Sequence, residues 1–178
     1  MTEQARKLRN EQRLAELYPS FAKRIRAIIR DMEKLGYRPR IQDGYRSPAK
    51  QLEAFESGHS KLEYGFHNVT GPGGLPESLA VDLLDDDRPL DPSKTYLVIL
   101  AAVAGRYKCS TGILWGLPGT IQDSLMREIA MANSDITHQI PEALKIGWDP
   151  THIEPSDISV SKAKAGERPP NLPELAGI

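Results

Sequence analysis

The chain has 178 residues, of which 39% are hydrophobic and 26% are charged, and its formal net charge is −1. This length suits one ordinary domain with its own core, and the composition is that of a soluble globular protein. The longest apolar run, residues 96–104, is too short to span a membrane. The single cysteine, Cys109, excludes an internal disulfide and a cysteine-rich zinc site.

The N-terminal part has two features that bear on location and partners. It lacks the charged-then-apolar layout of a secretory signal, which predicts synthesis in the cytoplasm. Residues 1–40 contain eleven Lys or Arg and five Asp or Glu, which is a local charge of +6. Such a basic segment can meet an anionic polymer such as nucleic acid. A solvated helix face is the simpler interpretation, because helix surfaces are normally charged.

The first segment predicted as helix covers residues 2–35. Pro19 interrupts it, so we expect a break near Tyr18 and a restart with Pro19 or Ser20 in the first turn. Gly36 is a suitable stop. Apolar residues recur at spacings of three and four and form one stripe for core packing. These residues are Leu14, Leu17, Phe21, Ile25, Ile28, Met32 and Leu35.

A strand-to-helix junction follows. Residues 38–43 are predicted to be extended, up to Gly44. A helix then begins at Pro48 and runs to about residue 57, with Ser47 as its N-cap. Arg46 therefore lies at the junction, from which side chains often project into clefts.

The rest of the chain alternates between loops and short elements. Residues 58–78 form a long loop rich in Gly and Pro, which is typical of a functional or mobile segment. Beyond residue 155 the composition turns polar and Pro-rich, so we expect an extended or disordered tail over 156–178 after a single domain of residues 1–155. Between them we expect a buried strand over 79–84, an acidic turn over 85–87, a helix over 92–107, a strand over 113–115, a helix over 120–133 and a last strand over 148–154.

The residues best suited to chemistry lie in and before the last strand. His152 can hold a metal through an imidazole nitrogen, while Asp149, three residues earlier, stays free to accept a proton. Asp82 interrupts an apolar run, and a buried acid needs a partner such as a metal ion. With His67 as a further ligand, the pattern predicts an open zinc site with three protein ligands.

In chain order, four segments carry a family resemblance: Gly44-Tyr45-Arg46-Ser47, a histidine, Leu79-Ala80-Val81-Asp82-Leu83, and Asp149-x-x-His152. They resemble the peptidoglycan D-Ala-D-Ala carboxypeptidase and L-Ala-D-Glu endopeptidase family, which includes vancomycin-resistance-type carboxypeptidases and phage endolysins. The family shares its zinc fold with the Hedgehog signalling domain and lysostaphin-like enzymes. The resemblance covers about residues 40–154.

The resemblance implies a role for each matched residue. The zinc (Zn2+) ligands would be His67, Asp82 and His152, listed here in chain order. Asp149 would be the general base, and Arg46 would orient the substrate. Glu154, which follows the last ligand closely, is expected to orient His152 and is the reserve candidate for the base. The implied fold is α+β, with a small antiparallel sheet that carries the zinc site, helices packed against it and an N-terminal amphipathic helix.

The spacing of the first two ligands departs from the family pattern. In the family the aspartate follows the histidine by seven positions, whereas here Asp82 follows His67 by fifteen. Phe66 and Ser78 also replace the usual Ser and Gly. A loop insertion is the simplest account, because lengthening a loop costs little entropy. His59 is the competing first ligand.

The resemblance implies a zinc-dependent metalloprotease acting by metal-activated water on peptidoglycan stem peptides. It would be an endolysin-like L-Ala-D-Glu endopeptidase or a D-Ala-D-Ala carboxypeptidase. We expect a monomer without a membrane span or nucleic-acid partner, which degrades the cell wall after release, as in phage lysis. Two other classes stay open. One is an inactive zinc-binding or wall-binding module of the same fold, and the other is a nucleic-acid-binding protein using the basic N-terminal helix.

Each residue also has a plain structural interpretation. Asp82 can pair with an arginine, His152 can be a hydrogen-bonded strand residue, and Arg46 can pair with Asp43 or Glu53. His138 has no carboxylate at a useful spacing and is expected at the surface or in a cap. The acidic turn 85–87 is either solvated or a calcium site.

Overall fold

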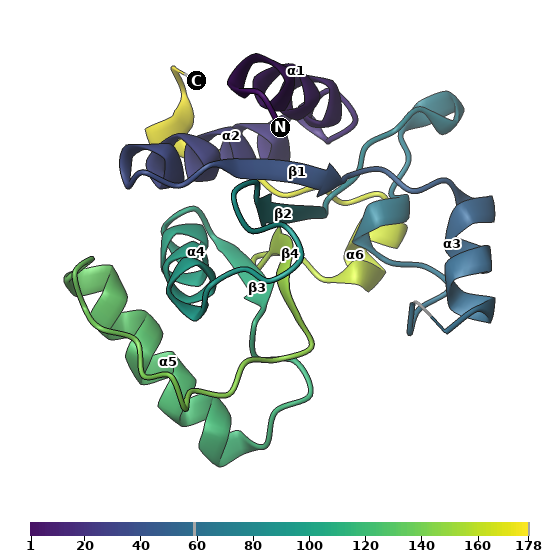
Figure 1. Ribbon diagram of the computed structural model, residues 1–178. Helices are drawn as coiled ribbons and strands as arrows, with labels where there is room; N and C mark the ends of the chain where they lie inside the picture. Colours follow the sequence, from purple (N-terminus) through teal and green to yellow (C-terminus); the bar gives the residue numbers. More distant parts are fainter. Residues whose placement is uncertain (59, 178) are drawn as a thin grey trace.

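A four-stranded antiparallel sheet lies at the centre of the computed structural model, which describes residues 1–58 and 60–177 (Figure 1). Helices pack around this sheet, so the expected α+β class, with a small antiparallel sheet and an N-terminal helix, is confirmed. The strand order within the described residues is β1-β2-β4-β3. The strands are β1 (Pro39–Asp43), β2 (Val81–Asp85), β3 (Cys109–Gly112) and β4 (Asp149–Pro155).

The N-terminal region forms two helices, α1 (Glu3–Leu14) and α2 (Pro19–Lys34), as the proline predicts. Pro19 occupies the first turn of α2, where its missing N–H costs no helical hydrogen bond. The apolar stripe of α2 is buried against the sheet and α4 (Lys94–Arg106). Its fully buried members are Phe21, Ile25, Ile28 and Met32.

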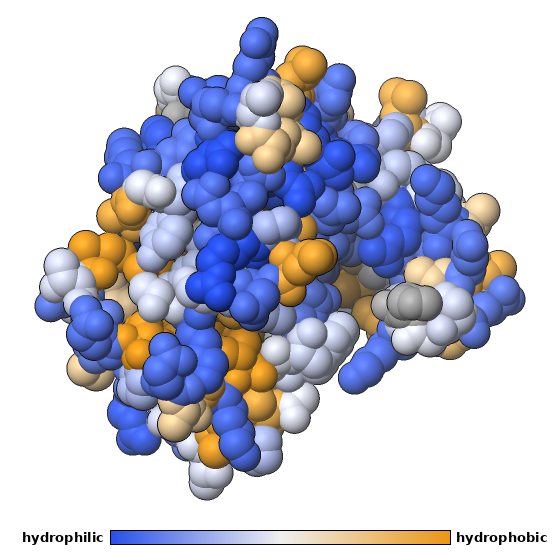
Figure 2. All heavy atoms as spheres, in the orientation of Figure 1, coloured by the Kyte–Doolittle hydropathy of each residue, from blue (hydrophilic) through white to orange (hydrophobic). Residues whose placement is uncertain are grey.

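Polar side chains of α1 form hydrogen bonds with backbone groups along the open edge of the sheet. Because β1 is an edge strand, its outer N–H and C=O groups have no strand partner. Asn10 accepts from the N–H of Ile41 at 2.8 Å, and Arg6 donates to the carbonyl of Pro39 at 2.6 Å. Arg9 donates to two further carbonyls of β1. Arg6 and Arg9 thus take part in the fold. The face of the molecule seen in Figure 2 is largely hydrophilic, with separate hydrophobic patches.

The acidic turn after β2 is also paired with arginines. Asp86 is buried and lies 2.9 Å from Nε of Arg40 and 3.2 Å from Nη2 of Arg38. Asp87 pairs with Arg38. These ion pairs join the turn to β1, and they give the carboxylates partners other than calcium.

The remaining helices are α3 (Pro48–Glu56), α5 (Gly119–Ser134) and α6 (Val160–Lys164), with short 3-10 turns η1 (Phe66–Asn68), η2 (Pro72–Gly74) and η3 (Pro173–Leu175). Ser47 caps α3 by accepting from the N–H of Lys50, as expected. Among the described residues, no helix is both long and apolar enough to cross a membrane.

The strand expected over 113–115 is wrong. The strand is β3, which ends at Gly112, and the three residues after it form a turn. The N–H of Trp115 donates to the carbonyl of Gly112 at 3.1 Å, and Gly116 adopts a positive φ of 76°. Ile113 is buried because the turn packs into the core, so its apolar character does not come from a strand.

The tail expected to be extended or disordered over 156–178 is instead packed in its described part. Arg24, fully buried in α2, makes two hydrogen bonds to Asp157 and one to the carbonyl of Pro170. Arg168 donates to Glu77 and to the carbonyl of Thr70. The polar composition misled the prediction because these long-range contacts use charges. The tail also buries three apolar side chains, those of Ala163, Leu172 and Leu175.

The packing of the tail can be tested by truncating one buried side chain. Leu175 is 2% exposed. Leu175→Ala should lower the free energy of unfolding by about 2–5 kcal/mol, because it removes buried methyl groups and leaves a cavity. Leu90, which is 98% exposed, supplies the control, and Leu90→Ala should change the value by less than about 0.5 kcal/mol. Urea denaturation measures both, and equal values would show that the tail does not contribute to the core.

Candidate metal centre

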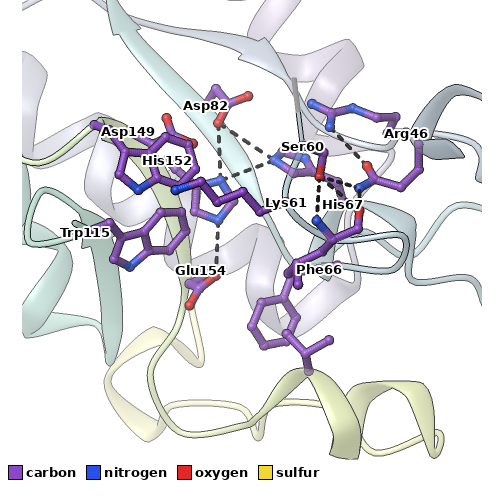
Figure 3. A pocket seen from close by; sticks show the side chains of 15 residues that line it. Arg46, Ser60, Lys61, Phe66, His67, Asp82, Trp115, Asp149, His152 and Glu154 are labelled. Carbon is purple, nitrogen blue, oxygen red and sulfur yellow. Dashed lines mark hydrogen bonds and ion pairs between the residues drawn. The ribbon is translucent and has the colours of Figure 1, made fainter. Parts of the chain in front are cut away.

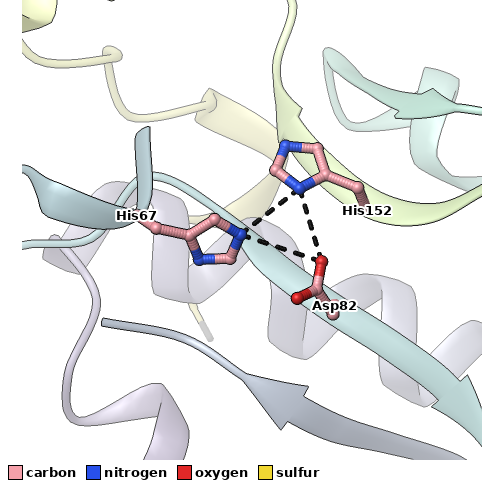
Figure 4. A group of neighbouring side chains, drawn as sticks. All are labelled: His67, Asp82 and His152. Atoms are coloured by element: carbon pink, nitrogen blue, oxygen red, sulfur yellow. Dashed lines mark hydrogen bonds and ion pairs between the residues drawn. The ribbon is translucent and has the colours of Figure 1, made fainter. Parts of the chain in front are cut away.

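Three elements bring His67, Asp82 and His152 together (Figure 4). Asp82 on β2 and His152 on β4 are paired directly across the two antiparallel strands. His67 enters from η1. Nε2 of His67 lies 3.3 Å from Nδ1 of His152 and 3.7 Å from Oδ1 of Asp82, and that Oδ1 lies 3.3 Å from Nδ1 of His152.

This triangle of donor atoms fits a zinc ion. Ligands 2.0–2.2 Å from a tetrahedral ion lie roughly 3.3–3.6 Å from one another, close to the observed spacing of 3.3–3.7 Å. Two imidazole nitrogens and one carboxylate oxygen are a donor set that zinc accepts. Three protein ligands leave one tetrahedral position open.

Hydrogen bonds outside the triangle orient both rings. Nδ1 of His67 lies 2.6 Å from the carbonyl of Gly44, so this nitrogen carries the proton and Nε2 presents its lone pair to the cluster. Nε2 of His152 lies 3.1 Å from Oε2 of Glu154, which turns Nδ1 toward the cluster in the same way. Glu154 therefore lies where a residue orienting His152 should lie.

The charges of the cluster are strongly coupled. Burial opposes ionisation of Asp82, but the imidazoles of His152 and His67 beside it outweigh this effect and hold the pKa of this carboxyl far below its usual range. Burial likewise disfavours the charged imidazole of His152, yet Asp82 and Glu154 raise its pKa to about 9. The carboxylates thus make a strongly cation-attracting site.

A closed loop carries His67 to the sheet. The N–H of Leu79 donates to the carbonyl of Phe66, and the N–H of Glu77 donates to the carbonyl of Val69, at 2.9 and 3.0 Å. These two hydrogen bonds form a neck between Phe66–Val69 and Glu77–Leu79. Residues 70–76 form a loop that begins and ends at this neck, which accounts for the long spacing between His67 and Asp82 in the sequence. Ser78, fully buried, donates from Oγ to the carbonyl of Ala80.

The cluster lies in a pocket of about 350 Å³ (Figure 3). Asp149, at the start of β4, is half-buried there, and burial together with the nearby charge of Asp82 raises its pKa. Arg46 lines the same pocket and pairs with Asp43 at 3.0 Å, while donating to Gln51 at 3.0 Å. The pairing with Asp43 expected as a structural alternative is therefore present, in a residue that also faces the pocket.

Two tryptophans that the sequence reasoning missed form one wall of the pocket. The rings of Trp115 and His152 are 4.9 Å apart, and those of Trp115 and Trp148 are 5.3 Å apart. Glycines allow the backbone segments that carry Trp115 and Trp148 to lie close together. A Cβ at Gly112 would collide with the carbonyl of Asp149, and one at Gly147 would lie 2.7 Å from the backbone of Trp115. The signal in the sequence was the place of Trp148 directly before Asp149.

His138 is separate from this cluster. His138 forms an ion pair with Glu128 of α5 at 2.6 Å, so the expectation that it lacks a carboxylate partner is wrong. Glu128 lies ten residues earlier in the sequence, within α5, whereas His138 follows the end of that helix. Spacing along the sequence did not suggest this pairing. His59, the competing first ligand, lies outside the described residues.

Comparisons with known proteins find similarity among solved structures. No family model matches the chain, and no curated protein matches it. Among solved structures the chain is similar to Serratia marcescens L-Ala D-Glu endopeptidase ChiX, with a TM-score of 0.48 and 18% identity. The match covers 83% of this chain and 86% of that one.

Metal binding provides the test of the centre. We expect one zinc ion per chain, lost in His67→Ala, Asp82→Asn and His152→Ala because each removes a ligand. Glu154→Gln should weaken zinc binding by about 10- to 100-fold, because the ring of His152 loses its orienting carboxylate. Metal analysis and competition with a chelator measure these effects, and His138→Ala is the control that should keep full affinity. Loss of zinc in His59→Ala with retention in His67→Ala would move the first ligand to His59.

Proposed function

We propose that the chain is a zinc-dependent peptidase that cleaves peptidoglycan stem peptides. The observation that carries the proposal is the triangle of His67, Asp82 and His152, with donor atoms 3.3–3.7 Å apart, in a pocket that also holds Asp149 and Arg46. Zinc supplies Lewis acidity there, which polarises a carbonyl group and acidifies water. The matched segments resemble the peptidoglycan carboxypeptidase and endopeptidase family in the same residues.

Asp149 has the properties of the general base. Its half-buried carboxylate lines the pocket beside the cluster, and no described contact uses it to hold another side chain. Burial and the charge of Asp82 raise its pKa toward the working pH, which favours proton transfer in both directions. Asp149 would accept the proton of the attacking water and then deliver it to the leaving amine.

Arg46 is suited to hold the substrate. Its guanidinium group is planar, and Asp43 and Gln51 each engage one of its terminal nitrogens at 3.0 Å. The group is therefore fixed in direction before substrate arrives, which lowers the entropic cost of binding. A planar donor fork suits a carboxylate or a carbonyl of the stem peptide.

The alternatives draw less support from these observations. An inactive module is expected to lack the base or the arginine, and both face the pocket here. Several arginines of the basic N-terminal region are occupied within the fold. Arg6, Arg9 and Arg24 bind backbone carbonyls or carboxylates of the same chain.

Digestion of purified peptidoglycan tests the proposal and identifies the bond. The zinc-loaded protein should create new termini that mass spectrometry detects. A new N-terminal D-Glu would identify an endopeptidase, and release of terminal D-Ala would identify a carboxypeptidase. Absence of new termini, relative to protein treated with a chelator, would refute the peptidase proposal.

Asp149→Asn separates the base from the ligands. The substitution keeps the shape of the side chain but removes the proton acceptor, so turnover should fall by roughly two to four orders of magnitude. Zinc content and melting temperature should stay at wild-type values. Glu154→Gln is the comparison, with a milder loss of turnover. The reverse order, with Glu154→Gln inactive and Asp149→Asn active, would assign the base to Glu154.

Arg46→Lys tests the substrate-holding role. A lysine keeps the charge but lacks the planar fork, so we expect at least a tenfold loss in kcat/KM, the equivalent of about 1.4 kcal/mol. Zinc content should not change, because no ligand is altered. Steady-state kinetics on the peptide identified by digestion measure the effect. Unchanged kinetics would leave Arg46 with its structural pairing to Asp43 alone.

A further inference from the structure

Lys61 reaches across the mouth of the pocket. Its side chain extends from the loop after α3, in front of His152 in Figure 3, and its Nζ lies 4.6 Å from the centre of the Trp148 ring. Trp148 directly precedes Asp149, and Trp115 links it to His152 through ring contacts. The ammonium group is therefore part of the same pocket as the metal cluster.

The base of this side chain is anchored, although its tip is not. Nε2 of Gln51, a buried residue of α3, donates to Oγ of Ser60 at 2.8 Å and to the carbonyl of Leu62. These two bonds flank Lys61 and hold its backbone. The same Gln51 accepts a hydrogen bond from Arg46 at 3.0 Å. One buried amide thus places both cations of the pocket wall.

Lys61 differs from Arg46, the other cation that lines the pocket, in having no ion pair among the described residues. Asp82 and Glu154 face histidines, and Arg46 pairs with Asp43. Within residues 1–58 and 60–177, no carboxylate lies in ion-pair distance of Lys61. Its ammonium group instead lies over the ring of Trp148. A cation held only by an exposed ring is weakly bound and available to an anion.

A carboxylate entering this pocket needs such a cation. Asp149 and Glu154 place negative charge along the β4 side of the pocket, and like charges repel an acidic ligand. An ammonium group at the mouth compensates for this repulsion, and it selects against a neutral amide of the same shape. Charge-assisted hydrogen bonds are the stronger kind, so the difference is measurable.

We propose that Lys61, seated on Trp148, is a specificity-determining residue that binds a free carboxylate of the substrate next to the bond that is cut. The substrate class is then acidic stem peptides, with the amidated forms of the same peptides as poor substrates. This inference rests on the proposed peptidase function. It adds a second cationic contact to that of Arg46.

Intrinsic fluorescence allows a binding test that does not depend on turnover. The chain has two tryptophans, and both line the pocket. The probes are L-Ala-γ-D-Glu-L-Lys and the same tripeptide with the D-Glu α-carboxylate replaced by a carboxamide, together with D-Ala-D-Ala and its C-terminal amide. In zinc-free wild-type protein, the acid of at least one pair should bind about ten- to a hundredfold more tightly than its amide.

Substitutions at Lys61 assign the preference to this residue. Lys61→Gln should remove the difference between acid and amide, whereas Lys61→Arg should retain part of it because the charge is kept. Lys145→Gln, an exposed lysine outside the pocket, is the matched control and should bind like wild type. Melting temperatures should agree among all four proteins, because Lys61 is exposed and its backbone anchor is unchanged.

The outcomes separate this inference from the proposed function. If the zinc-loaded wild type cleaves peptidoglycan but the zinc-free wild type binds acid and amide alike, the role of Lys61 is refuted and the peptidase proposal stands. Retained acid preference in Lys61→Gln has the same meaning. If no probe binds and no peptidoglycan is cleaved, both proposals fail. Acid preference that is lost only in Lys61→Gln, and kept in Lys145→Gln, supports the inference.

Discussion

The charge of Asp82 is the constraint on which the candidate metal site depends. Its neighbours in β2, Val81 and Leu83, are fully buried on the opposite face of the strand, while the Asp82 side chain, 22% exposed, lies against the two imidazoles in the pocket. A charge in such surroundings requires compensation. The register of β2 with β4 places His152 opposite Asp82, and the loop from Gly44 through η1 brings His67 to the same point. The sheet and the cluster are therefore stabilised by the same contacts.

The local signals in the sequence predicted much of this architecture. Pro19 and the Ser47–Pro48 pair mark helix starts through effects within one turn, and the structure has both. The three residues of the cluster stood in recognisable order, although only the fold shows that they converge. Contacts between distant segments were not predictable in this way. The tail appeared disordered because the partners of its charges, such as Arg24 for Asp157, lie far away in the sequence.

The N-terminal basic residues show how the fold itself can use the charge of a segment. A local charge of +6 over residues 1–40 suggests an anionic ligand. In the structure, Arg6 is 1% exposed. It donates a hydrogen bond to the carbonyl of Pro39 and forms ion pairs with Glu3 and Glu33. Arginine is suited to this task because its several donors can satisfy a strand edge and a carboxylate at once. The net charge of a segment says little until its partners inside the fold are known.

The neck at Val69 and Glu77 separates the number of residues between two ligands from the distance between them in space. The chain leaves the core at one hydrogen bond and returns beside it, and Arg168 braces the return by binding Glu77 and Thr70. The excursion between them, with Leu75 largely exposed, contributes nothing to the cluster. Its length therefore does not determine how far His67 lies from Asp82. A pattern that fixes the number of residues between His67 and Asp82 overlooks this arrangement, because the paired strands and the hydrogen bonds at the base of the loop determine the distance between them.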